Sequence, residues 1–152
     1  MTDETYRTAM RSLIGVRWEE VWKAIPRAAE GTDIEGVHDV RVASRRLRAA
    51  MDVAAPAFPP SWYKPLHRLA KEITSELGEV RDRDVMIEYL TAAREAAPPN
   101  EHPGVDRLID RIERERMIAR LTMEQFLQDL SNRGMRDETR RRFPIDSPAE
   151  KS

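Results

Sequence analysis

The stretch from Val37 to Met51, VHDVRVASRRLRAAM, limits the fold more than any other part of this chain. On a helix at 100° per residue its side chains separate into two faces. One face is basic, and Asp39 is the only acid between the two ends of the stretch. The apolar face comprises Val40, Ala43, Leu47 and Met51. Because a strand alternates with a period of two, only a helix separates these residues so cleanly. The pattern therefore predicts an amphipathic helix.

The basic face of this helix forms a stripe. Arg41, Arg45 and Arg48 lie within about 80° of His38, whereas Arg46 lies about 80° away on the other flank. The rise from His38 to Arg48 is about 15 Å, which suits an extended anionic ligand. Most basic helix faces are only solvated surface. Like charges at these spacings repel, however, so we expect either acidic neighbours from other helices or an anionic ligand.

The rest of the chain also has helical periodicity. Apolar spacing and turn residues predict four helices. They cover 4–29, the basic stretch continued to about Ala55, 61–96 and 104–130. Pro26 should kink or end the first helix, and Ser61 should cap the third. No stretch reads as a strand. We predict an all-α fold, a four-helix bundle of long antiparallel helices over residues 1–135. Residues 136–152 would form a short basic segment and a flexible tail.

The bulk composition narrows the classes of protein. The 152 residues suffice for one domain, and the net charge is only −1, so an anion site needs local segregation of charge. The absence of cysteine excludes disulfides, thiolate metal sites and cysteine nucleophiles. No apolar run is long enough to cross a membrane, and the first residues lack a signal pattern. We expect a cytoplasmic protein.

The third predicted helix carries a second cationic stripe. Relative to His67, the side chains of Lys64, Lys71 and Arg81 fall within about 60°, and Arg68 lies at the edge. Gly78 lies within the stripe, where a glycine suggests a bend or the close approach of another helix or a ligand. Alone, this stripe would be a solvated face. If it faces the first stripe, the two form a surface of like charge.

No catalytic or metal site emerges from the sequence. Asp82 and Asp84 are two residues apart and point about 200° apart on a helix, so they cannot share a cation. We expect them instead to orient Arg81, Arg83 or a residue on another helix. No nucleophile–base set or carboxylate cage can be assembled. The sequence predicts no enzyme activity, no cofactor and no metal.

Two motifs resemble those of the CHAD family, α-helical domains named for a histidine. The first matches H-x-x-R-V-x-x-R-R-L-R, and the second, about 40 residues later, matches L-G-x-x-R-D-x-D-V. The matching residues of the first are His38, Arg41, Val42, Arg45, Arg46, Leu47 and Arg48. Those of the second are Leu77, Gly78, Arg81, Asp82, Asp84 and Val85. The resemblance covers roughly residues 5–130.

The resemblance implies an all-helical domain that binds inorganic polyphosphate through basic side chains without catalysis. It also implies association with polyphosphate granules in some organisms and a link to CYTH-type triphosphate hydrolases. Carried onto the two stripes, it gives ten candidate binding residues: His38, Arg41, Arg45, Arg46, Arg48, Lys64, His67, Arg68, Lys71 and Arg81.

The chain departs from the family in length. The usual domain is about twice as long and has two similar bundles, each with a basic helix, around a cationic pore. Here the only candidate for a second basic helix, RDETRRRF at 136–143, has no histidine and lacks the R-R-L-R ending. We therefore expect a half-domain that pairs as a homodimer about a two-fold axis.

The alternative function is a helical nucleic-acid-binding module that uses the same basic face. Against it, no aromatic residues alternate with the arginines to stack on bases, and no helix-turn-helix pattern is present.

Overall fold

The computed structural model describes residues 3–145 and contains only helices and turns within them, so the predicted all-α class is confirmed. Two short 3₁₀ turns, η1 (Ala55–Ala57) and η2 (Pro99–Glu101), connect the longer elements. The α-helices are α1 (Asp3–Glu30), α2 (Glu35–Ala54), α3 (Pro60–Ala96), α4 (His102–Asn132) and α5 (Met135–Arg142).

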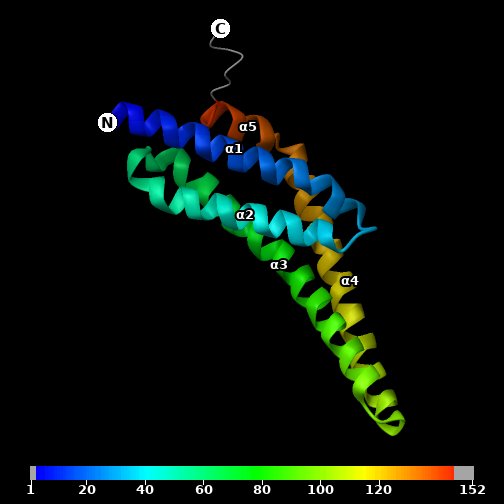
Figure 1. The fold of residues 1–152 in the computed structure, drawn as a ribbon. Helices are drawn as coiled ribbons and strands as arrows, with labels where there is room; N and C mark the ends of the chain where they lie inside the picture. Colours follow the sequence, from blue (N-terminus) through cyan, green and yellow to red (C-terminus); the bar gives the residue numbers. More distant parts are fainter. Residues whose placement is uncertain (1–2, 146–152) are drawn as a thin grey trace.

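The helices do not run side by side over their full lengths, as a four-helix bundle would require. In Figure 1, α1 and α2 lie antiparallel, and α3 and α4 form a long hairpin whose tip projects well beyond them. No residue between Leu90 and Met123 is buried. The bundle detail of the prediction is therefore not confirmed: the core is confined to one end of the hairpin, where α1, α2 and α5 cover it.

The helix ends follow from local chemistry, with one departure from expectation. Gly31 ends α1 as predicted, in the left-handed conformation at φ 79°. Pro26 lies inside α1, which continues to Glu30, close to the predicted end. Ser61 does not cap α3, because the helix already begins at Pro60, a residue suited to a first helical position. Asp33 provides the start of α2 by accepting a hydrogen bond from the Glu35 backbone N–H at 2.9 Å.

The core is built from large side chains on four helices and the residue after α5. Trp18 of α1, Leu47 of α2, Tyr63 of α3 and Leu130 of α4 are almost completely buried, as is Phe143. Tyr63 also donates from its hydroxyl to the Met51 carbonyl at 2.7 Å, which ties the start of α3 to the end of α2. This packing fixes the relative position of the two helices that carry the predicted basic stripes.

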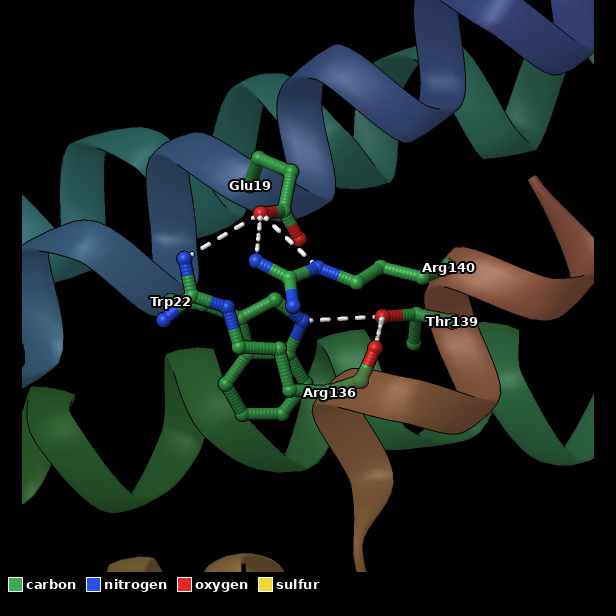
Figure 2. Close-up of polar contacts among 5 residues, drawn as sticks. All are labelled: Glu19, Trp22, Arg136, Thr139 and Arg140. Atoms are coloured by element: carbon green, nitrogen blue, oxygen red, sulfur yellow. Dashed lines mark hydrogen bonds and ion pairs between the residues drawn. The ribbon is translucent and has the colours of Figure 1, made fainter. Parts of the chain in front are cut away.

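The segment after residue 135 belongs to the core rather than lying outside it. Figure 2 shows Glu19 of α1 accepting from Arg136 at 3.1 Å and from Arg140 at 2.8 Å. Beside them the Trp22 indole N–H donates to the Thr139 hydroxyl at 2.9 Å. The sequence predicted that this segment lies outside the bundle, because its many charged residues obscure the few that are buried. The expected tail at 146–152 lies outside the described residues.

Candidate functional site

The basic stripe of α2 lies where the helical wheel places it. Val40 and Leu47 are fully buried on one side of α2, while Arg45 on the other side is exposed. Arg41 and Arg48 are half-buried and lie about two turns apart along the same face. His38 is also half-buried, near the start of the helix. The stripe therefore runs along α2 from His38 to Arg48, and the last turn of the helix has no basic residue.

The α3 stripe lies along the α2 stripe in antiparallel register. The Ser44 and Thr74 hydroxyls are 2.9 Å apart, and the Asp52 carboxylate is 2.6 Å from the His67 ring nitrogen. At the other end, Arg41 packs over Gly78, where a Cβ would lie 3.6 Å from the arginine Nε. The close approach predicted at Gly78 is therefore made by the side chain of an arginine from α2.

These contacts bring most of the predicted residues to one junction, which we call the basic seam. Its residues are Arg41, Arg45 and Arg48 of α2 and His67, Lys71 and Arg81 of α3. His38 lies at one end. Lys64, one turn before His67, extends the seam at the other end and is exposed.

Two predicted residues lie off the seam. Asp39 pairs with Arg27 of α1 at 2.9 Å, which marks the α1 side of α2. Arg46 follows Asp39 by two helical turns and therefore lies on that side, as its position on the wheel predicted. Arg68 lies about 100° around α3 from His67, at the outer edge. Both side chains are exposed.

The cations of the seam have few counter-charges. Within residues 3–145, no carboxylate lies within 4.0 Å of the basic groups of Arg45, Arg48, Lys71 or Arg81, and Arg46, Lys64 and Arg68 are equally unpaired. Asp82 reaches Arg41 at 3.9 Å, and Asp52 pairs with His67. The seam therefore has one carboxylate near each end and unpaired cations between them.

The two acids correct the expectation of a surface without internal compensation. Sequence reasoning missed Asp52 as a seam residue because it follows Met51, the last residue of the stretch considered. Its signal was available, since Asp52 is four residues after Arg48 and falls on the same face.

Some guanidinium groups of the seam are buried without a hydrogen-bond acceptor. The Nε atoms of Arg41 and Arg48 and one Nη atom of Arg81 have no partner among the described residues. A buried N–H without an acceptor costs about 1–3 kcal/mol. The seam thus holds donors that an anion with several oxygens could satisfy.

The second motif contributes to the site and to the fold at once. Asp84 is buried and forms an ion pair with Arg116 of α4, whereas Asp82 is exposed beside Arg41. The sequence left open whether these acids orient Arg81, Arg83 or a residue on another helix, and the structure places Asp84 with Arg116 of α4 and Asp82 3.9 Å from Arg41 of α2. Within the described residues, no group of three or more His, Asp or Glu could hold a metal ion.

The family model for the CHAD domain matches residues 13–152, which is most of the chain. The chain belongs to the CHAD family. The two motifs that suggested it lie against each other in the structure, through Arg41 over Gly78. The match also includes the segment after residue 135, in agreement with the docking of α5 on α1. Searches among curated proteins and among solved structures found no match.

Proposed function

We propose that this CHAD-family chain binds inorganic polyphosphate along the basic seam. The observation that carries the proposal is the row of cations without partners: Arg45, Arg48, Lys71 and Arg81. Like charges one turn apart on a helix repel, so a row of cations without counter-charges favours an anionic ligand. Membership in the family supports the choice of polyphosphate, a linear polymer with about one negative charge on each internal phosphate.

The geometry suits a linear ligand. Arg41 and Arg48 are seven residues apart, a rise of about 10 Å, and His38 and Lys64 extend the row at its two ends. A planar guanidinium donates two hydrogen bonds to one phosphate and keeps its charge at all working pH values. Successive phosphates would contact successive side chains, and the buried N–H groups of Arg41, Arg48 and Arg81 would gain acceptors.

The test is retention of long-chain polyphosphate by the double variant Arg41→Ala with Arg45→Ala. We expect retention to be lost while helicity, measured by circular dichroism, is unchanged. The affinity of the native chain should also fall steeply with salt, because bound polymer releases counterions. Unchanged binding by the double variant would refute the assignment. Competition with single-stranded and double-stranded nucleic acid separates this function from nucleic-acid binding.

We further propose that binding occurs without hydrolysis. The carboxylates nearest the seam, Asp52 and Asp82, lie at opposite ends of it and each faces a basic side chain. They therefore cannot form the shared cage of a metal-dependent phosphohydrolase. Incubation of polyphosphate with the chain, with and without magnesium, should release no phosphate. Release proportional to protein concentration would contradict this.

We also propose that two copies associate and lengthen the cationic surface. Beyond the start of α2, the seam face of α3 continues as an exposed apolar surface: Val85 is 46% exposed, Met86 45% and Tyr89 68%. Light scattering should give the mass of a dimer, and Tyr89→Lys should shift it toward the monomer. A monomer at high micromolar concentration would overturn the proposal.

The cellular setting is proposed from the family alone. A polyphosphate binder of this kind would act in the cytoplasm, on polyphosphate granules, or beside a CYTH-type triphosphate hydrolase. Among residues 3–145, no helix has both the length and the apolar character needed to cross a bilayer. A fluorescent fusion should colocalise with stained polyphosphate and become diffuse when Arg41 and Arg45 are replaced by alanine.

A further inference from the structure

A second basic region lies away from the seam, in a cavity of about 710 Å³ near the start of α3. Three parts of the chain converge there: α1, the loop from η1 into α3, and the end of α5. Trp62, which lines it, is about 140° around α3 from His67. We call this cavity the arginine pocket, after its four lining arginines: Arg7, Arg11, Arg141 and Arg142.

Aromatic rings hold two of these arginines. The guanidinium carbon of Arg142 is 4.9 Å from the centre of the Trp62 ring, and that of Arg11 is 5.8 Å from the centre of the Phe58 ring. Contacts of this type attract a cation without using its N–H donors. Arg11 forms no ion pair within residues 3–145. Its donors are thus available to a ligand.

The charges of the pocket do not balance. Among residues 3–145, no carboxylate lines it. Glu4 pairs with Arg7 at 3.0 Å, and Glu138 pairs with Arg141 at 2.5 Å and with Arg142 at 3.4 Å. Two carboxylates outside the lining thus face four guanidiniums. The N-terminus of α3, which has no side-chain cap, borders the cavity through Pro59 and adds positive potential.

The docking of α5 holds the pocket in shape before any ligand arrives. The Glu19 contacts with Arg136 and Arg140 fix α5 on α1 (Figure 2), and the two pocket arginines of α5 follow directly. At the end of α5, a Cβ on Gly15 would lie 2.2 Å from the Phe143 carbonyl oxygen, so the two segments are in close contact. A preformed site pays less ordering entropy on binding.

We propose that the arginine pocket binds a compact di- or triphosphate group, carried by a nucleotide or by a short inorganic phosphate chain. Four guanidinium forks match an anion with many oxygens, and they favour phosphate over a single carboxylate. The cavity has the volume of a small-molecule site, whereas the seam is an open row. This site is independent of polyphosphate binding at the seam.

The experiment is calorimetric titration of the full chain with ATP and, separately, with inorganic triphosphate. The test variant is Arg11→Gln with Arg141→Gln, which removes two charges and keeps a polar, unbranched side chain at each position. We expect at least tenfold weaker binding of both ligands. Arg141→Gln alone, at a largely exposed position, should weaken binding several-fold without any effect on folding. Thermal unfolding of each variant checks the fold.

Two controls make the outcome decisive. Arg107→Gln with Arg114→Gln removes the same charge from exposed positions on α4, and Arg45→Ala with Arg48→Ala removes it from the seam. Both should bind the two ligands as the native chain does. Equal affinity for ATP and inorganic triphosphate would show that the pocket recognises the phosphates alone. Tighter binding of ATP would show that the pocket also contacts the base. No saturable binding by the native chain, or an equal loss in the seam variant, would overturn the proposal.

Discussion

Most arginines of α4 and α5 have a carboxylate partner, whereas the arginines in the middle of the basic seam have none among the described residues. Arg116 of α4 pairs with Asp84, Arg133 just after α4 pairs with Asp129 at 3.2 Å, and Arg140 of α5 pairs with Glu19 at 2.8 Å. On the seam, Arg45 and Arg48 have no carboxylate within 4.0 Å among the described residues. One region uses arginine to join or decorate helices, and the other leaves it unpaired.

The difference teaches that counter-charges, more than the number of basic residues, distinguish a ligand site from a solvated face. An exposed ion pair contributes only about 0–1 kcal/mol, yet this chain forms such pairs at most other helices. Glu and Asp are slightly more numerous than Lys and Arg overall, at 27 against 26. Few carboxylates lie at the seam because of where they are placed, and not because the chain has few of them. This placement does not stabilise the fold.

The first prediction tests whether the unpaired arginines of the seam bind polyphosphate. Arg45→Ala with Arg48→Ala should weaken long-chain polyphosphate binding by about a hundredfold, which corresponds to about 2.7 kcal/mol. The control, Arg111→Ala with Arg133→Ala, removes the same charge from two exposed ion pairs, one on α4 and one at its end. It should change affinity by less than about threefold. Filter binding at fixed salt measures both. Similar losses in the two variants would mean that net charge alone drives binding.

Much of this contrast was visible in the sequence. The apolar period of α2 placed Arg41, Arg45 and Arg48 on one face, and the family motif joined them to Gly78 and Arg81. Helix existence was predictable because each long helix has a sustained apolar stripe. The start of α3 was less predictable, since the helix begins at Pro60, before the expected cap Ser61.

What the sequence could not give was pairing between distant segments. Asp84 and Arg116 are 32 residues apart, and Glu19 and Arg140 are 121 apart. Nothing in local periodicity connects them. The docking of α5 was missed for this reason, and so was the arginine pocket, whose arginines come from the two ends of the described chain.

The second prediction tests the structural side of the comparison. Arg116→Ala should leave the buried Asp84 carboxylate, 2% exposed, without its partner and lower the free energy of unfolding by about 2 kcal/mol. The loss is below that of a fully buried pair because Arg116 is 26% exposed. Arg45→Ala should change stability by less than about 0.5 kcal/mol. Urea denaturation measures both. Equal destabilisation would show that the seam arginine also supports the fold.

The third prediction concerns the pH dependence of the α5 docking. Burial raises the pKa of Glu19, but hydrogen bonds and charges from Arg140 and Arg136 outweigh it, so the pKa lies below its ordinary value. Because the folded pKa is the lower one, the contribution is complete above about pH 4.3 and is lost as the pH falls through the folded pKa.

The variant Glu19→Gln isolates that contribution. It should lower the free energy of unfolding by about 1 kcal/mol at neutral pH, as expected for partly exposed charge-assisted contacts. The difference from the native chain should shrink below about pH 4.3, since the protonated Glu19 then resembles glutamine. Urea denaturation at a series of pH values measures it. A difference that stays constant into strong acid would assign the stability to packing instead.

The smallest expected effect on polyphosphate affinity comes from removing the two acids of the seam. Asp52→Asn with Asp82→Asn takes the partner from His67 and the neighbouring carboxylate from Arg41. Both acids are more than half exposed and therefore screened, so affinity for polyphosphate should rise only about threefold.

The matched control, Asp110→Asn with Asp129→Asn, changes net charge equally on α4. At about 0.1 M salt, charges more than about 10 Å from the ligand are largely screened, and the control should leave affinity unchanged. An equal rise in both variants would mean that the ligand responds to the charge of the whole molecule. A rise only in the seam variant would mean that Asp52 and Asp82 limit the binding surface at its two ends.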